Sequence, residues 1–346
     1  MVKRTTLSDI AEETGVSVSM VSRVINGKAC RISKEKRDLI LEIAREKRYK
    51  PNQLARGLVS QRSGTFGLIL PSITSRLYTS LTEELEKECN ARGYGLFLAN
   101  SGNTCEGDSR LIDLLDARGV DGIFIVPSYD SFSDPTIVEH LRAASVPVVF
   151  ALRVLEDADW DEVIFDSEYG GYLAARHLIE LGHTKIGCVA NTRESNTGRL
   201  RFKGYAKALT EAGIDVNPAY ILQSPYTMSG GYEAGKELLK TDVTAVFCGS
   251  DYIALGIRKA FLDAGKRVPE DYPMVAFDVS ESDFLFDPPI PAIVQDITLL
   301  GKELFDVMQR RLDGETGEPI KVLLTPKLVL GDEIRQTDSL AGKRAL

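Results

Sequence analysis

The sequence predicts a small all-α head that contains a helix-turn-helix, followed by an α/β body of two doubly wound parallel-sheet subdomains. Three observations predict this fold class. The chain has 346 residues, which is enough for two or three domains. Residues 1–50 carry short helical patterns, whereas from Gly64 short apolar strands alternate with amphipathic helices. Charge also changes along the chain. Residues 1–62 carry 14 Lys and Arg and 7 Asp and Glu, whereas the remaining residues carry 28 Lys and Arg and 43 Asp and Glu.

The uneven charge indicates what the head contacts. The whole chain has a formal net charge of -8, so its basic head sits on an acidic body. Such a division is typical of a protein in which only the head meets a nucleic acid. The alternative is a solvated basic face without a partner, and charge alone does not decide between the two.

The first helix is predicted from the stretch "TTLSDIAEETG". Thr6 offers a hydroxyl to cap free backbone amides, and Asp9 places an acid near the positive end of the helix dipole. Apolar residues recur at i, i+3 and i+4 from Leu7 and form one face. Gly15 ends the helix, because a tight turn needs a backbone conformation that glycine adopts easily.

A second helix is predicted over "SVSMVSRVIN", from Ser17 to Asn26. Val21 and Val24 can pack inward, and Val18 lies near the exposed start. Two helices around a glycine turn predict a helix-turn-helix, whose second helix enters the major groove of DNA. The residues expected to face outward are Ser19, Ser22, Arg23 and Asn26.

A third helix is predicted from its cap, Ser33, to about Lys47, and Pro51 stops it because proline cannot continue a helix. Residues 51–63 are then too few to form a stable helix alone. One interpretation of this segment is a linker. The other is a hinge that becomes helical only on DNA, where Leu58 would wedge a base step in the minor groove and Arg56 would meet the backbone.

The body repeats a strand–helix pattern. Strands are predicted at "FGLILP", "GLFLANS", "GIFIVPS", "PVVFAL", "EVIFD", "KIGCVAN", "YILQSPY", "AVFCGS" and "MVAFD", and helices at 78–92, 106–118, 134–144, 169–182, 198–212, 229–240, 251–264 and 298–313. We take "EVIFD" as the start of a second series and expect the chain after Asp278 to cross back. The predicted domains are 1–50 for the head, 51–63 for the hinge, 64–161 with 294–321 for the first subdomain, and 162–293 with 322–336 for the second.

This architecture predicts a ligand cleft between the subdomains, outside the carboxyl ends of the strands. Asp166, Tyr226, Asp251 and Asp278 each follow a predicted strand. Each can instead be a helix cap or a loop residue, and Asp251 fits an N-cap especially well. Asp278 is the strongest candidate ligand, because a carboxylate can accept two ligand hydroxyls. Arg201 begins a helix as a fixed donor, or else forms a surface salt bridge.

The sequence carries no signature of an enzyme. It contains no P-loop, no GxGxxG after a strand, no HExxH and no GxSxG, and its three histidines are isolated. The five cysteines are scattered without a CxxC pair, which favours buried thiols in a reducing compartment. No apolar run is long enough to span a bilayer, and no signal-peptide pattern opens the sequence. We therefore expect a cytoplasmic protein that is not an enzyme, with no cofactor and no metal site.

The head and the hinge together carry a specific resemblance. The stretches "TLSDIAEETGVSVSMVSRVING" and "YKPNQLARGLVSQRSGTFGLILP" resemble the lactose/galactose/purine repressor family of bacterial transcription regulators. The body carries the same resemblance in the stretches "HLIELGHTKIG", "AVFCGSDYIALG" and "VPEDYPMVAFD". The resemblance therefore covers nearly the whole chain. It implies a homodimeric, sequence-specific DNA-binding regulator, most often a repressor, with a body like that of periplasmic binding proteins and a small-molecule effector.

The resemblance also implies residue roles. Val18, Ser19 and Arg23 would read bases, with Val18 against a thymine methyl and Arg23 on guanine O6 and N7. Leu58 would be the leucine wedge of the hinge helix. The full DNA-binding set is Thr6, Ser17, Val18, Ser19, Ser22, Arg23, Asn26, Asn52, Ala55, Arg56 and Leu58. The full effector-binding set, in which Tyr78 and Tyr226 are aromatic walls, is Tyr78, Asp166, Thr197, Arg201, Tyr226, Asp251, Asp278 and Gln295.

The chain departs from the family pattern at several places. Purine-binding members carry an Arg where this chain has Ser195, which disfavours a purine base as the effector. Ala151 replaces a carboxylate of the lactose-repressor pocket, which argues against the same sugar as the effector. No leucine heptad follows the last strands, so we expect a dimer and not a coiled-coil tetramer. The expected partners are a pseudo-palindromic double-stranded DNA operator and a sugar, polyol, sugar phosphate or nucleoside effector. The alternative is a sugar-binding or sugar-modifying protein without a DNA function.

Overall fold

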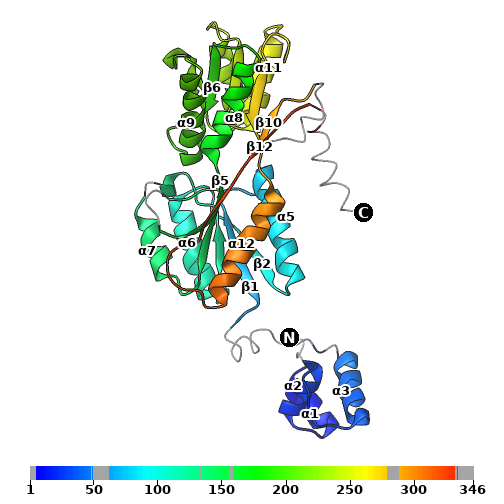
Figure 1. Ribbon diagram of the computed structural model, residues 1–346. Helices are drawn as coiled ribbons and strands as arrows, with labels where there is room; N and C mark the ends of the chain where they lie inside the picture. The colour runs from blue at the N-terminus through cyan, green and yellow to red at the C-terminus, as the bar shows by residue number, and fades with distance from the viewer. Residues whose placement is uncertain are drawn as a thin grey trace. The chain divides into compact units, whose positions relative to one another are not determined.

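The computed structural model describes residues 5–47, 49, 62–132, 134–155, 159–278, 288–331 and 333. The chain divides into two compact units, Met1–Ser63 and Gly64–Leu346. The first unit is helical, and the second contains two sheets with helices around each (Figure 1).

The described part of the small unit is a three-helix bundle made of α1 (Leu7–Thr14), α2 (Val18–Ile25) and α3 (Lys34–Glu46). A hydroxyl residue precedes each helix and accepts a hydrogen bond from a backbone amide of the first turn; these caps are Thr6, Ser17 and Ser33. Gly15 ends α1 with a left-handed φ of 66°. The buried centre is formed by Ile10, Ala11, Val21, Val24, Ile40 and Ile43. The predicted helix-turn-helix is therefore present, Thr6 and Ser33 are the predicted caps, and Ser17 is a cap that the sequence analysis did not predict.

The first sheet of the large unit has the strand order β11-β5-β4-β3-β1-β2. Its strands are β1 (Thr65–Leu70), β2 (Gly95–Asn100), β3 (Ile123–Ile125), β4 (Val148–Ala151), β5 (Asp161–Phe165) and β11 (Lys321–Leu324). All neighbouring strands in it are parallel. Helices α5 (Arg76–Ala91) and α12 (Ile297–Leu312) share one hydrophobic core with it, and α6 (Cys105–Ala117) and α7 (Thr136–Ala143) share the other.

The second sheet has the order β12-β10-β9-β8-β6-β7. Its strands are β6 (Ile186–Ala190), β7 (Ile221–Gln223), β8 (Ala245–Cys248), β9 (Met274–Phe277), β10 (Ala292–Val294) and β12 (Lys327–Val329), and only the β10–β12 pair is antiparallel. Helices α8 (Ser167–Glu180) and α9 (Asn196–Glu211) cover one face, while α10 (Met228–Leu238) and α11 (Asp251–Asp263) cover the other. Short 3-10 helices lie at Asp130–Phe132 and Pro218–Tyr220. The predicted fold class, two doubly wound parallel-sheet subdomains behind a helical head, is confirmed.

The crossing points between the subdomains differ from the predicted ones. Strand β5, which we expected to open the second subdomain, pairs with β4 and β11 in the first sheet. The chain therefore crosses after Phe165, and not before Glu162. Likewise β11 lies wholly in the first sheet and Val294 in the second, because Val294 pairs with Lys327 of β12. An apolar strand pattern shows that a strand is buried but not which sheet holds it, so the sequence could not place these crossings.

An ion pair fixes two of the crossing segments. Arg311 of α12 donates from Nε and Nη2 to the two carboxylate oxygens of Asp161, each at 2.7 Å, and the Asp161 carboxylate also accepts the Ile320 amide at 2.8 Å. Asp161 begins β5, and Ile320 immediately precedes β11. The pair therefore ties α12 and the entry to β11 onto β5.

Among the residues that the structure describes, no helix is long and apolar enough to cross a membrane.

Candidate functional site

The exposed face of α2 carries the residues predicted to read bases. Ser17, Val18 and Ser19 at its start and Arg23 near its end are exposed, and Val18 is 44% exposed although it is apolar. This face stays at the surface because Val21, on the opposite side of the helix, is buried. An exposed helix N-terminus with short side chains leaves room for close approach to a groove, and an exposed Arg adds a bidentate donor.

Other predicted DNA-binding residues have structural partners of their own. The side chain of Asn26 donates to the carbonyl oxygen of Ser22 at 2.7 Å, so these two half-buried residues close the end of α2. Thr6 forms a reciprocal capping box with Asp9, whose carboxylate accepts the Thr6 amide at 2.7 Å. Asn52, Ala55, Arg56 and Leu58 lie outside the described residues.

In the large unit, three of the predicted effector-binding residues meet at the carboxyl ends of β9 and β10. Asp278 follows β9 with a left-handed φ of 65°, and its Oδ1 accepts a hydrogen bond from Nε2 of Gln295 at 2.6 Å. Burial raises the pKa of Asp278 above its ordinary value, while Arg201 and the Gln295 hydrogen bond act to lower it. Both groups therefore favour the charged form of the Asp278 carboxylate, against the effect of burial.

Arg201 itself is a buried cation that protein atoms only partly satisfy. It is 6% exposed, it donates from Nη1 to the carbonyl oxygen of Gly249 at 2.6 Å, and its guanidinium lies 3.5 Å above the ring of Phe277. Its Nε is buried and has no hydrogen-bond partner among the described residues. Since an unpaired buried donor is costly, this atom is a natural ligand contact.

The first subdomain contributes a second group, which Arg153 organises. Its guanidinium donates to the hydroxyl of Tyr78 on α5 and to the carbonyl oxygen of Pro127 at 3.1 Å, and it lies 3.8 Å above the ring of Tyr129. Burial raises the pKa of both tyrosine hydroxyls, so they are neutral donors and acceptors at physiological pH. Tyr78 was predicted from the resemblance to the family, whereas Tyr129 and Arg153 were missed.

The two groups face each other across the subdomain boundary. The rings of Tyr129 and Tyr226 lie 5.9 Å apart, and the Arg199 guanidinium of α9 lies 4.4 Å above the ring of Phe132. A small cavity of about 10 Å³ lies between the subdomains here, lined by Pro127, Ser128, Tyr129, Phe132, Arg153, Val154, Glu194 and Asn196. Among the described residues, this cavity lies beside Arg153 and is not lined by Asp278, Gln295 or Arg201.

The remaining predicted residues have local partners or positions of their own. The Thr197 hydroxyl bonds to the Ser195 hydroxyl at 2.8 Å, and Tyr226 donates to the same Ser195 oxygen at 3.5 Å. Asp166 caps α8 by accepting the Tyr169 amide at 2.8 Å, which matches its structural alternative. Asp251 is not the cap of α11, because Ser250 fills that position and Asp251 is the first helical residue. A serine hydroxyl and an aspartate cap equally well, so the sequence pattern alone could not choose.

The signal for Tyr129 and Arg153 was present in the sequence. Both follow apolar stretches, "GIFIVPS" and "PVVFAL", at the carboxyl ends of β3 and β4. The strand-end rule that selected Asp278 in the second sheet applies to them equally.

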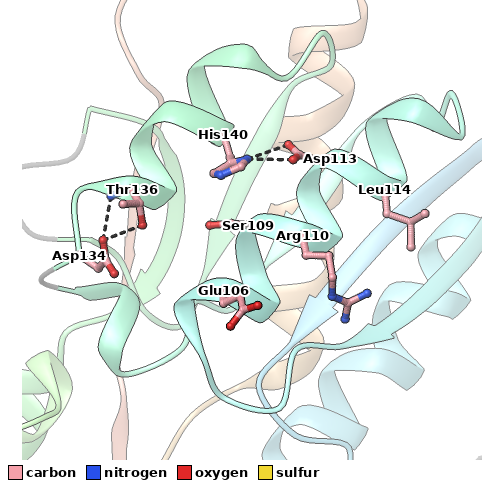
Figure 2. A pocket seen from close by; sticks show the side chains of 8 residues that line it. All are labelled: Glu106, Ser109, Arg110, Asp113, Leu114, Asp134, Thr136 and His140. Atoms are coloured by element: carbon pink, nitrogen blue, oxygen red, sulfur yellow. Dashed lines mark hydrogen bonds and ion pairs between the residues drawn. The ribbon is translucent and has the colours of Figure 1, made fainter.

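A larger hollow lies elsewhere, on the flank of the first subdomain. Figure 2 shows this pocket of about 630 Å³, lined by Glu106, Ser109, Arg110, Asp113, Leu114, Asp134, Thr136 and His140. Its main polar groups pair with one another: His140 with Asp113 at 2.9 Å, and Asp134 with Thr136 at 2.6 Å. None of the predicted effector-binding residues lines it. In the described part of the chain, no group of three or more His, Cys, Asp or Glu side chains could hold a metal ion.

Comparison with known proteins decides the family. The model of bacterial regulatory proteins of the lacI family matches residues 6–52, and a periplasmic binding protein-like domain matches residues 175–332. The HTH-type transcriptional repressor PurR of Pasteurella multocida (strain Pm70) is 30% identical over 333 residues, which are 95% of this chain and 98% of that protein. The chain belongs to the lacI family of bacterial regulatory proteins.

Solved structures of the family agree with the fold of this lacI-family chain. The lac repressor dimer bound to operator and the anti-inducer ONPF superposes with a TM-score of 0.85 at 27% identity, covering 95% of this chain and 98% of that one. The transcriptional regulator CelR in complex with cellobiose gives a TM-score of 0.72 at 29% identity, covering 95% and 99%. The chain is therefore a DNA-binding transcription regulator and not an enzyme, as the sequence predicted.

Proposed function

We propose that the chain is a homodimeric, cytoplasmic repressor of metabolic genes that binds a pseudo-palindromic operator and is controlled by a sugar-like effector between its two subdomains. The observation that carries this proposal is the pairing of two sites in one chain. One is an exposed reading face on α2, and the other is a cluster of polar groups where the subdomains meet, including the buried Arg201, whose Nε is unsatisfied among the described residues.

On DNA, α2 enters the major groove with Ser17, Val18 and Ser19 towards the bases. Arg23 donates to guanine O6 and N7, and Val18 contacts a thymine methyl group. Ser22 and Asn26 support the docking at the helix end, where they already bond to each other. From the sequence, Leu58 is the hinge residue that wedges the central minor-groove step when two chains bind together.

In the cleft, the chemistry suits a ligand with several hydroxyls. The Asp278 carboxylate accepts, while Gln295 and Arg201 donate, so the three can bind adjacent hydroxyls of a sugar or polyol. Tyr78 and Tyr226 supply ring faces for the apolar side of such a molecule. Because both subdomains line the site, a ligand changes how they meet, and a coupling of about 1–3 kcal/mol would change operator affinity about 5- to 150-fold.

An exposed apolar edge supports the dimer. Strand β2 is an edge strand of the first sheet, and its Phe97 and Leu98 are 46% and 49% exposed. Leu114 on the following helix is 40% exposed. An open sheet edge with large apolar side chains is a liability unless another chain covers it, and a two-fold interface covers the same edge on both protomers.

The cysteines support the reducing compartment that a DNA-binding regulator needs. All five are free thiols, and Cys89, Cys105, Cys188 and Cys248 are buried. Buried unpaired thiols are the usual state in a cytoplasm that keeps cysteines reduced.

The experiment that tests the DNA function is selection of bound sequences from a random duplex library by the full chain, followed by titration of the selected site. Arg23→Ala should cost about 1–3 kcal/mol and relax the preference at one base pair in each half-site. Leu58→Ala should weaken the selected site and spare random DNA. Arg45, an exposed cation on α3, is the matched control, and Arg45→Ala should leave base preference unchanged. If Arg23→Ala weakens all sequences equally, α2 does not read bases through this residue.

A further inference from the structure

The backbone at the end of β4 aims Arg153 into the subdomain boundary. Leu152 is buried and has a φ of 63°, a left-handed conformation that a leucine rarely adopts. The Arg153 amide donates to the carbonyl oxygen of Ala151 at 2.6 Å, which tightens the turn. Asp278 has the same left-handed conformation at the end of β9 in the other sheet. Residues with such strained backbone conformations cluster at ligand-binding sites, where the fixed position of a side chain outweighs the energetic cost of the strain.

The partners of Arg153 are all neutral. Its guanidinium donates to the Pro127 carbonyl and the Tyr78 hydroxyl, and it stacks on Tyr129. Within the residues that the structure describes, no Asp or Glu forms an ion pair with it. A guanidinium remains charged in any protein environment, and a half-buried cation without an anionic partner is unfavourable.

The nearby carboxylates are engaged elsewhere. Asp278 accepts from Gln295 and faces Arg201. Glu194 lines the same small cavity as Arg153, but it is exposed and accepts from Asn191 at 3.2 Å. The described part of the cluster therefore holds three guanidinium groups, from Arg153, Arg199 and Arg201, and one half-buried carboxylate, that of Asp278.

We propose that Arg153 determines the specificity of this cleft, and that the effector is a sugar-like molecule with one carboxylate or phosphate group, which pairs with the Arg153 guanidinium. The inference rests on the proposed function, because it names the class of ligand for the same cleft. The anion takes the place that the Tyr78 hydroxyl holds on Arg153, while the hydroxyls of the ligand reach Asp278 and Gln295. An arginine suits this role because its planar fork matches two oxygens of a carboxylate or phosphate.

The test is calorimetric titration of the full chain with matched neutral and anionic compounds. The probes are glucose, glucuronate and glucose 6-phosphate, and ribose with ribose 5-phosphate. We expect an anionic member to bind at least about tenfold more tightly than its neutral parent, because it gains a charge-assisted hydrogen bond. The carboxylate and phosphate members of the series then distinguish the two forms of the anion.

Three variants separate the role of Arg153 from general effects. Arg153→Gln should weaken the anionic probe about 10- to 150-fold and remove the preference over the neutral sugar. Arg153→Lys should keep the preference with lower affinity, since lysine offers a point charge without the fork. The control is Arg176→Gln, because Arg176 on α8 also lies over a tyrosine ring and donates to that tyrosine's hydroxyl at 3.0 Å, yet lies outside the cluster. It should leave binding unchanged.

The outcomes distinguish failure of this inference from failure of the proposed function. Equal binding of neutral and anionic sugars, or undiminished anion binding by a folded Arg153→Gln variant, overturns the inference and leaves effector control intact. Folding of the variant is checked by its melting temperature and by its affinity for the selected DNA site. If no probe binds the parent chain and none changes its affinity for that site, both the inference and effector control are overturned.

Discussion

The Asp161–Arg311 pair allows a quantitative test of how the crossing segments are held. The two side chains are 9% and 13% exposed, and they form two parallel hydrogen bonds of 2.7 Å. Asp161→Ala would leave the Arg311 guanidinium buried without its anion and would also free the Ile320 amide. Breaking a buried pair by removing one partner costs about 3–5 kcal/mol, because the remaining charge stays uncompensated. We expect a loss of unfolding free energy in this range.

The chain contains a matched control for burial. Arg310 and Glu315 form the same bidentate geometry, at 2.7 and 2.6 Å, but their side chains are 51% and 44% exposed. Exposed pairs are screened by solvent and contribute about 0–1 kcal/mol. Glu315→Ala should therefore cost little, although its geometry is as good as that of the buried pair.

The assay is urea unfolding followed by the fluorescence of Trp160, the single tryptophan of the chain, which precedes Asp161 and packs against Phe150. Asp161→Asn should give an intermediate loss, since an amide can still accept from Ile320 without the charge. If Asp161→Ala and Glu315→Ala lower the unfolding free energy equally, burial does not set the strength of the buried pair, and the reasoning fails.

Three further predictions concern the cleft, the dimer and the packing of helices. Asp278→Ala should abolish the effect of the effector on operator affinity while leaving ligand-free DNA binding intact; fluorescence anisotropy measures both, and a retained response would place the effector elsewhere. Phe97→Glu should shift the chain from dimer to monomer in sedimentation velocity, because it buries a charge in the β2 edge contact, and a dimer that persists would exclude that edge. Gly204→Ala should lower stability by about 1–3 kcal/mol in thermal unfolding, because its Cβ would lie 1.8 Å from the Glu168 carbonyl oxygen and force α8 and α9 apart. An unchanged melting temperature would contradict such close packing.

The sequence predicted the helices well because their ends carry local chemistry. Thr6, Ser17 and Ser33 each cap the helix that was expected to follow. Gly15 provides the left-handed turn where two helices had to separate. Capping depends on contacts within four residues, so it can be read without the fold.

The partners of the strands and the contents of the cleft depend on distant contacts. Glu162 pairs in register with Phe150 and Lys321, and no local pattern states that β5 belongs with them. Asp278 was predicted from the strand-end rule and the resemblance to the family, and Arg201 from its place at the start of a helix and the same resemblance. The position of Arg153 after a predicted strand is visible in the sequence, whereas its contacts with Tyr78 and Tyr129, which lie far from it in the sequence, appear only in the fold.

The contact of Tyr129 with Tyr226 across the subdomain boundary has a consequence for the speed of sensing. Their rings lie 5.9 Å apart, and the cavity beside Arg153 measures about 10 Å³. We expect a sugar-sized ligand to enter after the two subdomains have parted, and the parting has its own rate. The observed rate of ligand association should level off as ligand concentration rises.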